Sequence, residues 1–323
     1  MQKVNYNPRI SIIMVNYNGL QYLQKSIQPI LDLDYPNYEF IIVDNGSTDG
    51  SIEYIKTYKN VHLEISPKRQ SKNFACNFAA NLSNGEYLLF LDCDCVITNF
   101  HILEELIDQH LNNQNIGLIG LSYFDYNENK TNGYGNFYQN FLVENKPFLP
   151  FEKVMSLHNS IISFPSGIGI FISRIRWQEL GGYDDTLIFG GDDSDLGIRL
   201  WLFGYRNYLY SRTIQMHIGK QEKQNNKKYA AKYSHIVCSR IYDIIKNYQL
   251  ANLIIAIPYI LIIYFLKTIK QSIIRSYPLL FVSYIYGLYL TIIKIPTALA
   301  KRKIIQKNRK INFDIFLKIK SPI

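Results

Sequence analysis

Cysteine is scarce in this 323-residue chain, and no two cysteines stand in a CxxC pair. A secreted disulfide framework is therefore not expected. The chain also lacks a long apolar run near its start, where only about six apolar residues precede polar ones. That run is too short for a signal peptide, so we expect the catalytic part of the protein to be cytoplasmic.

Charge is low overall and uneven along the chain. Charged residues make up 19% of the sequence, which argues against disorder. Residues 219–323 carry 19 Lys and Arg against 3 Asp and Glu, whereas residues 1–218 carry 16 against 23. Such a basic segment suits nucleic acid or an anionic membrane surface. Because residues 251–266 are uncharged and residues 278–300 contain only Lys294, we expect a membrane surface and no nucleic acid as partner.

Apolar strands alternate with amphipathic helices through the first 121 residues. This pattern predicts an α/β fold with a doubly wound, mostly parallel sheet, which binds its ligands at the carboxyl ends of the strands. Ser47 or Thr48 is expected to cap the second helix. The strands are predicted at residues 9–15, 39–44, 61–65, 86–92 and 116–121, and the helices at 20–31, 50–58, 74–82 and 100–111.

Polar side chains stand where these strands end. Asn16 follows the first strand and Asp44 the second, and Asp92 and Asp94 close the apolar stretch at residues 87–97. Alternation along a strand would direct Asp92 and Asp94 to one face and the interleaved cysteines to the other. Two neighbouring carboxylates at the mouth of a sheet need a positive partner, so we expect a cation between them.

The later part of the chain is less regular. Residues 122–165 have no assignable pattern and suggest a mobile or acceptor-facing insertion. Helices are expected again near residues 174–180 and from residue 192 onward. We predict a catalytic domain over residues 1–220 and a basic, apolar, helical, membrane-associated region over residues 221–323.

Four segments in this order resemble family 2 glycosyltransferases with the GT-A fold, and a rhamnosyltransferase-like subgroup is one alternative within that family. They are SIIMVNYNG (residues 11–19), IIVDNGSTDGS (41–51), FLDCD (90–94) and GGYDD with GGDDSDLGIRL (181–200). The resemblance implies an inverting, metal-dependent transferase that uses a nucleotide-sugar donor. It further implies a glycan or lipid-linked acceptor and a place at the cell membrane. The positions that it implies for donor contact are Val15, Asn16, Asn18, Asp44, Asn77 and Asp92.

The resemblance also assigns the metal site. Asp94, the second acid of FLDCD, would bind Mg²⁺ or Mn²⁺, hard cations that are usually held by one or two carboxylates and the phosphates of a substrate. His217 stands near the position of a metal-binding histidine in the family, although a lone histidine is as often structural. Cys93 and Cys95 are expected to pack as small hydrophobic residues rather than to bind metal.

Inverting transfer needs a general base that deprotonates the acceptor hydroxyl. The resemblance assigns this role to Asp193 and assigns acceptor contact to Gly191 and Asp192, where Asp192 stands in place of the usual Glu. Acids that only stabilise a helix N-terminus would explain one Asp, but not three in four positions. Asp195 and Arg199 have the spacing of a helical ion pair.

One segment departs from the family. In residues 68–81, Cys76 replaces the usual Arg before Asn77, and Lys68, Arg69 or Lys72 is left to supply the charge that meets the phosphates. Two other functions stay open at this point. A sugar nucleotidyltransferase shares the sheet and metal but usually has a Gly-rich, Lys-containing loop after its first strand, and a non-catalytic membrane scaffold could keep the fold.

The apolar segments at residues 251–266 and 278–300 could form a membrane hairpin or lie in the membrane interface. Lys267, Lys270 and Arg275 lie in the connection between them, against the tendency of basic loops to stay on the cytoplasmic side. We therefore favour helices in the interface. On this interpretation, truncation near residue 248 should leave a soluble catalytic domain.

Overall fold

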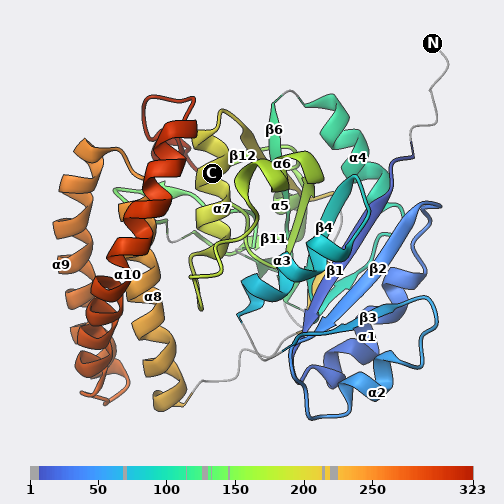
Figure 1. Cartoon of the computed structure of the whole chain (residues 1–323), viewed down its shortest axis with the longest axis horizontal. Coiled ribbons are helices and arrows are strands. Elements are labelled where there is room, and N and C mark those ends of the chain that lie inside the picture. The colour runs from blue at the N-terminus through green and yellow to red at the C-terminus, as the bar shows by residue number, and fades with distance from the viewer. Residues whose placement is uncertain are drawn as a thin grey trace.

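The computed structural model describes residues 7–67, 71–113, 115–125, 130–131, 133–144, 146–212, 215–218 and 225–322. Its first part alternates strands and helices as expected (Figure 1). These elements are β1 (Ile10–Asn16), α1 (Leu20–Leu31), β2 (Tyr38–Asp44), α2 (Ser51–Ile55), β3 (His62–Ile65), α3 (Lys72–Leu82), β4 (Tyr87–Asp92), β5 (Cys95–Ile97), α4 (Ile102–Asn112) and β6 (Ile116–Leu121).

The second part has several two-residue strands and a long helical C-terminus. In chain order it contains β7 (Phe124–Asp125), β8 (Lys130–Thr131), β9 (Tyr138–Gln139), β10 (Leu142–Val143), β11 (Leu149–Pro150), α5 (Phe151–Met155), β12 (Ile161–Ile162), β13 (Gly169–Ser173), α6 (Arg174–Leu180), α7 (Asp192–Leu202), β14 (Arg206–Tyr210), β15 (Gln215–His217), α8 (Asn226–Asn247), α9 (Leu250–Ile274), α10 (Leu280–Asn308) and the 3₁₀ helix η1 (Ile315–Lys318).

An eight-stranded sheet with the order β12-β14-β6-β13-β4-β1-β2-β3 forms the centre of the molecule. β1, β2, β3 and β4 are parallel, whereas β13 is antiparallel to both of its neighbours, β4 and β6. The prediction of a mostly parallel α/β sheet is confirmed, with β13 as an antiparallel insertion that the sequence pattern did not indicate. The register pairs Asn16 with Asp44 and Val15 with Asp92, so the polar ends of β1, β2 and β4 lie at one edge of the sheet.

Successive residues of β1 face two separate hydrophobic cores. Ile12 and Met14 pack on the side of α1 and α4, and Ile13 packs on the side of α3 and α7. The second core continues into the C-terminal helices, where it includes Val237 of α8 and Tyr284 of α10. Residues 221–323 thus share a core with the catalytic part, and the division at residue 220 stays a prediction.

The three C-terminal helices lie beside one another, and α7 lies between them and the sheet (Figure 1). α8 packs between α7 and α10. A Cβ atom on Gly287 of α10 would lie 2.7 Å from the backbone oxygen of Ser234 and 2.9 Å from Cβ of Val237, so glycine allows the two helices to approach closely.

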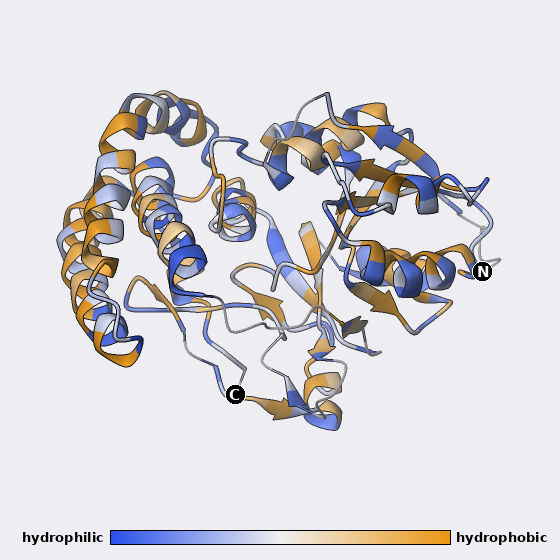
Figure 2. Cartoon of the chain, turned by 90° about the horizontal axis from the view of Figure 1, so that it is seen from below, coloured by the Kyte–Doolittle hydropathy of each residue, from blue (hydrophilic) through white to orange (hydrophobic). Residues whose placement is uncertain are grey.

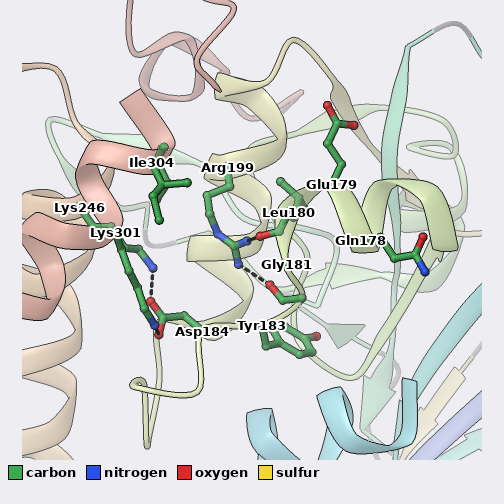
Figure 3. A pocket seen from close by; sticks show the side chains of 12 residues that line it. Gln178, Glu179, Leu180, Gly181, Tyr183, Asp184, Arg199, Lys246, Lys301 and Ile304 are labelled. Carbon is green, nitrogen blue, oxygen red and sulfur yellow. Dashed lines mark hydrogen bonds and ion pairs between the residues drawn. The ribbon is translucent and has the colours of Figure 1, made fainter. Parts of the chain in front are cut away.

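A buried ammonium group joins α8 to the catalytic part. Nζ of Lys246 lies 2.5 Å from Oδ2 of Asp184 and 2.6 Å from Oδ1 of Asp195, and all three side chains are at most 3% exposed. Arg199 pairs with Asp195 at 2.8 Å, as expected from their spacing, and Lys301 of α10 pairs with Asp184 at 2.5 Å (Figure 3). The nearby cavity of about 340 Å³ is lined by these already paired charges and by no residue of the predicted site.

Lys246→Met should lower the free energy of unfolding by about 3–5 kcal/mol, because it removes a buried cation shared by two buried carboxylates and leaves each of them with a single cation, Lys301 or Arg199. Lys310→Met is the matched control: its Nζ lies 3.5 Å from Glu179, but its side chain is 59% exposed, so about 1 kcal/mol or less is expected. Urea unfolding followed by tryptophan fluorescence measures both. Equal losses in the two variants would contradict the role given to Lys246.

Candidate active site

The carboxyl ends of β1 and β2 are joined by a buried hydrogen bond. Nδ2 of Asn16 donates to Oδ2 of Asp44 at 2.8 Å and to Oγ of Ser47 at 3.0 Å. Oδ1 of Asp44 accepts from the backbone N–H groups of Gly46 at 3.0 Å and Ser47 at 2.8 Å. Asn16 and Asp44 are fully buried. In this conformation they shape the loop after β2, and a nucleotide would meet that loop before it met either side chain.

The prediction that Ser47 or Thr48 caps the second helix is wrong. α2 begins after Gly50, which has φ +87°, and Oδ1 of Asp49 accepts from the backbone N–H of Ser51 at 3.1 Å. Oγ of Ser47 instead accepts from the backbone N–H of Asn18 at 2.9 Å. The turn after β1 and the loop after β2 are therefore joined by a hydrogen bond, because Oγ of Ser47 contacts Asn18 instead of capping α2.

Asn18 is the most accessible of the residues expected to contact the donor near β1. It is exposed, adopts a left-handed backbone conformation with φ +50°, and accepts from the backbone N–H of Thr48 at 2.8 Å. Val15 is half-buried against the core. Of the three predicted positions on β1 and its following turn, only Asn18 offers an open polar surface to a ligand.

Asp92 receives its positive partner from α3. Nζ of Lys72, the first residue of α3, forms an ion pair and a hydrogen bond with Oδ1 of Asp92. Burial raises the pKa of Asp92 above its ordinary value, while Lys72 acts in the opposite direction and the charge of Asp94 adds to the increase. Lys68 and Arg69, the other candidates for a phosphate-binding cation, lie outside the described residues.

Asp94 faces a different cation. β4 ends at Asp92, and Cys93 and Asp94 form a turn, so the expected strand alternation does not reach Asp94. Oδ2 of Asp94 lies 3.2 Å from Nε2 of His217, and Nδ1 of His217 lies 3.5 Å from Oδ1 of Asp125. His217 is placed there by β15, which pairs with β5 on one side and β7 on the other. The hydrogen bond to Asp94 raises the pKa of His217, although burial opposes this increase.

These two residues fit a divalent cation bound together with a ligand. Asp94 and His217 offer one carboxylate and one imidazole side by side, and Nδ1 of His217 is buried without a hydrogen-bond partner. No group of three or more acidic, His or Cys side chains able to hold a metal occurs among the described residues. At such a site the protein would supply two ligands, and substrate phosphates would have to supply others.

The cysteines near this turn are not metal ligands. Cys95 is fully buried in the core beside α1 and α4, and Cys93 packs against the same core. Burial raises the pKa of both thiols, and the charges of Asp92 and Asp94 raise it further, which disfavours the thiolate that a metal would require. The expectation that they serve as small hydrophobic residues agrees with the structure.

The predicted base lies at the start of α7. Gly191 precedes the helix with φ +88°, and Asp192 and Asp193 are its first two residues. A Cβ atom on Gly167 would lie 2.6 Å from Oδ2 of Asp193, so the absence of a side chain at residue 167 leaves room for this carboxylate. Burial raises the pKa of Asp193 well above its ordinary value, and the charge of Asp192 adds to this effect.

Lys72 connects the donor side of the site with this base. Its ammonium group pairs with Asp92, and the charges of Asp92 and then Asp193 raise its pKa well above the ordinary value, although desolvation opposes this increase. The sequence offered Lys72 only as one of three candidate cations. Lys72 reaches Asp92 because α3 begins opposite the end of β4, which the sequence does not indicate.

Asn77 makes hydrogen bonds that the sequence did not indicate. Its Nδ2 donates to the backbone oxygen of Tyr183 at 2.9 Å, and its Oδ1 accepts from the backbone N–H of the same residue at 2.9 Å. Asn73, one helical turn earlier, donates to the backbone oxygens of Asp184 and Leu187. The amide of Asn77 holds the loop before α7, and donor contact by this residue stays a prediction without a supporting contact.

A cavity of about 220 Å³ opens beside the start of α7. Asp192 and Asp193 line it from the catalytic part, and residues of α8 and α9 line it from the C-terminal part. The sequence motifs gave no signal for this second wall, because α8 and α9 lie beyond the last of them. Its lining residues are Val143, Phe164, Gly190, Gly191, Asp192, Asp193, Ser194, Ile236, Ser239, Arg240 and Tyr264.

Comparison with known proteins identifies the family. The family model described as Glycosyl transferase family 2 matches residues 11–175, which is about half of the chain. The chain belongs to this family. An uncharacterised glycosyltransferase of Haemophilus influenzae is 40% identical over 103 residues, which make up 31% of this chain and 41% of that protein.

Two solved structures show that the fold is of the GT-A type. The mannosyltransferase PcManGT from Pyrobaculum calidifontis, in complex with GDP-Man and Mn²⁺, has a TM-score of 0.55 at 17% identity, and the match covers 90% of this chain and 88% of that one. Residues 1–349 of Staphylococcus aureus TarS, in complex with UDP-GlcNAc, have a TM-score of 0.57 at 15% identity, with 96% and 90% covered.

Asp94→Asn and His217→Gln should each weaken the binding of Mn²⁺ in the presence of a nucleoside diphosphate by roughly tenfold or more, since each removes one of two protein ligands. Asp108→Asn changes an exposed acid on α4 and serves as the control. Manganese titration followed by electron paramagnetic resonance measures the affinity. Binding that is as tight in both site variants as in the control would rule out this metal site.

Proposed function

We propose that the protein transfers a sugar from a nucleotide-sugar donor to a hydroxyl group of a glycan or lipid-linked acceptor, with inversion at the anomeric carbon. The observation that carries this proposal is the position of Asp193. It is a carboxylate with a raised pKa that lines a cavity at the start of α7, and its charge also raises the pKa of Lys72. A base with this environment suits removal of a proton from a sugar hydroxyl.

On the donor side, the diphosphate would lie at the carboxyl end of the sheet. Asp94 and His217 would hold a divalent cation, which neutralises phosphate charge when it is bound. Mn²⁺ accompanies the nucleotide sugar in the related PcManGT structure. Lys72 supplies a further positive charge, and transfer of its ion pair from Asp92 to a phosphate would free the Asp92 carboxylate for the ribose.

On the acceptor side, Asp193 would accept the proton of the attacking hydroxyl. The acceptor oxygen forms a bond to the anomeric carbon while the bond from that carbon to the diphosphate oxygen breaks, and the nucleoside diphosphate leaves with the electron pair. The base stands opposite the leaving group in such a displacement, which is why the product has the inverted configuration. The raised pKa of Asp193 brings its basicity closer to that needed near neutral pH.

Asp193→Asn should lower kcat by about 10²–10⁴-fold with little change in donor affinity, because it keeps the shape of the side chain but removes the base. In the unmodified enzyme, kcat/KM should fall as the pH drops through the raised pKa of Asp193, because the protonated acid cannot accept a proton. Asp192→Asn removes a charge that raises this pKa and should move the acidic limb to lower pH. Unchanged turnover in Asp193→Asn would refute the assignment.

We further propose that α9 and α10 attach the protein to a membrane surface without spanning it. α9 is 25 residues long and α10 is 29, and both are apolar enough for a span (Figure 2). Their outward faces carry exposed apolar side chains. On α9 these include Ile254, Ile255, Ile262, Phe265, Leu266, Ile273 and Ile274, and on α10 Val282, Ile285, Ile292 and Ile293.

The inner face of α10 argues against a hairpin through the bilayer. Lys294 donates to the backbone oxygen of Thr186 at 2.6 Å, and Arg302 donates to the backbone oxygens of Ile245 and Tyr248. From Gly287 to Arg302, about 22 Å of helix lies against α8 and the catalytic part. A span along α10 would carry these polar partners into the hydrocarbon layer, so an in-plane arrangement costs less free energy.

Ile255→Glu with Ile262→Glu should weaken binding to vesicles that contain phosphatidylglycerol by at least tenfold, because each exposed isoleucine contributes roughly 1.5–3 kcal/mol when buried. Leu111→Glu, at a 57% exposed position on α4, is the control. A cysteine at the 72% exposed position of Ile273 tests the topology. Reaction of that thiol only with a reagent on the side opposite the catalytic domain would show that the helices span.

A further inference from the structure

The cavity at the start of α7 is built from two distant parts of the chain. Asp192 and Asp193 line it from α7, whereas Ile236 and Arg240 line it from α8 and Tyr264 lines it from α9. Apart from the carboxylates and Arg240, most of its walls are apolar or glycine. A ligand that reaches Asp193 through this cavity therefore also contacts α9, one of the two helices with an exposed apolar face.

Arg240 is an unusual residue in this wall because it is buried without a carboxylate partner. Arg240 is only 7% exposed. It donates to the hydroxyl oxygens of Tyr138 and Tyr248, both at 3.0 Å, and to the backbone oxygen of Phe141. Within the described residues, no carboxylate lies within 4.0 Å of its guanidinium group.

The nearest acid on the same helix does not supply the missing charge. Asp243 accepts from Oγ of Ser194 at 2.9 Å and from Nδ2 of Asn247 at 3.2 Å, and burial with the charge of Asp195 raises its pKa well above the ordinary value. Its hydrogen bonds go to Ser194 and Asn247, and among the described residues the guanidinium group of Arg240 is held by uncharged oxygens. A buried cation of this kind is costly unless an anion joins it, and guanidinium matches a phosphate well.

We propose that this cavity binds an acceptor that carries a phosphate group on a lipid, with the phosphate at Arg240, the reacting hydroxyl at Asp193 and the lipid along α9. The inference rests on the proposed function and specifies its acceptor. Tyr264 places α9 in the wall of the cavity, and Ile188 and Phe189, exposed just before Gly190, add an apolar rim. An acceptor held in a membrane would reach this opening from the side on which α9 lies.

Octyl phosphate is a probe for this site, because it combines one phosphate with a short apolar chain. Its affinity for the full-length protein is measured by titration calorimetry, alongside inorganic phosphate and octyl glucoside. We expect octyl phosphate to bind at least tenfold more tightly than either comparison compound. Equal affinity for inorganic phosphate would show that the lipid part contributes nothing and would overturn the lipid-linked assignment.

Arg240→Gln should lower the affinity for octyl phosphate by about 10–100-fold, the loss expected for charge-assisted hydrogen bonds. Arg302→Gln is the matched control, since Arg302, like Arg240, donates to backbone oxygen but does not line the cavity. Ile236→Trp narrows the cavity and leaves Arg240 intact, so it keeps the test decisive if Arg240→Gln fails to fold. Equal affinity in Ile236→Trp and the unmodified protein would refute the site.

Competition separates this proposal from the proposed function. If a nucleoside diphosphate with Mn²⁺ displaces octyl phosphate, the probe occupies the donor site and the acceptor proposal is wrong. If octyl phosphate binding depends on Arg240 but no nucleotide sugar is turned over, the anion site stands and the proposed transfer fails. If Arg240→Gln leaves the KM for a phosphate-bearing acceptor unchanged while Asp193→Asn abolishes turnover, transfer stands and the anion site fails.

Discussion

Lys246 lies between Asp184 and Asp195, and the parts of the molecule that form the site meet at this ammonium group. Asp195 belongs to α7, which carries Asp193 two residues earlier. The loop that contains Asp184 is held to α3, the helix that begins with Lys72, by the amides of Asn73 and Asn77. Lys246 itself belongs to α8, which carries Arg240. The ion pairs thus fix the relative positions of Asp193, Lys72 and Arg240.

The fold was easier to predict than the site, because the site is assembled by contacts between elements that are distant in sequence. Continuous apolar strands and amphipathic helices give local signals, and the alternation through residue 121 agrees with the prediction, except that α2 is shorter than expected and β5 was not predicted. β13 did not reveal its direction, because an apolar run of five residues reads the same in a parallel or an antiparallel pair. Residues 122–165 contain strands of two residues, which are too short to show a periodicity in the sequence.

Within the site, the sequence indicates the positions of residues at the ends of long strands but not the positions that are set by turns. Asp92 follows a regular strand, but a turn at Cys93 carries Asp94 toward His217 instead of keeping it on the same face as Asp92. The partner of Asp92 could not be selected from three basic residues, because the choice depends on where α3 starts relative to β4. Such contacts are set by packing between elements rather than by the spacing within one of them.

The C-terminal helices combine two tasks that their composition did not separate. Basic and apolar residues predict membrane association, and on that basis truncation near residue 248 was expected to leave a soluble catalytic domain. Tyr284, Ile305 and Phe316, however, complete the same core as Ile13 of β1, so removal of α9 and α10 would expose the core and remove Lys301, one of the two cation partners described for Asp184. The same helices turn apolar faces outward and close the cavity beside Asp193 on their inner side. On the proposed function, α8 and α9 would bring a membrane-bound acceptor to Asp193, and the orientation of the protein on the membrane would be part of acceptor selection.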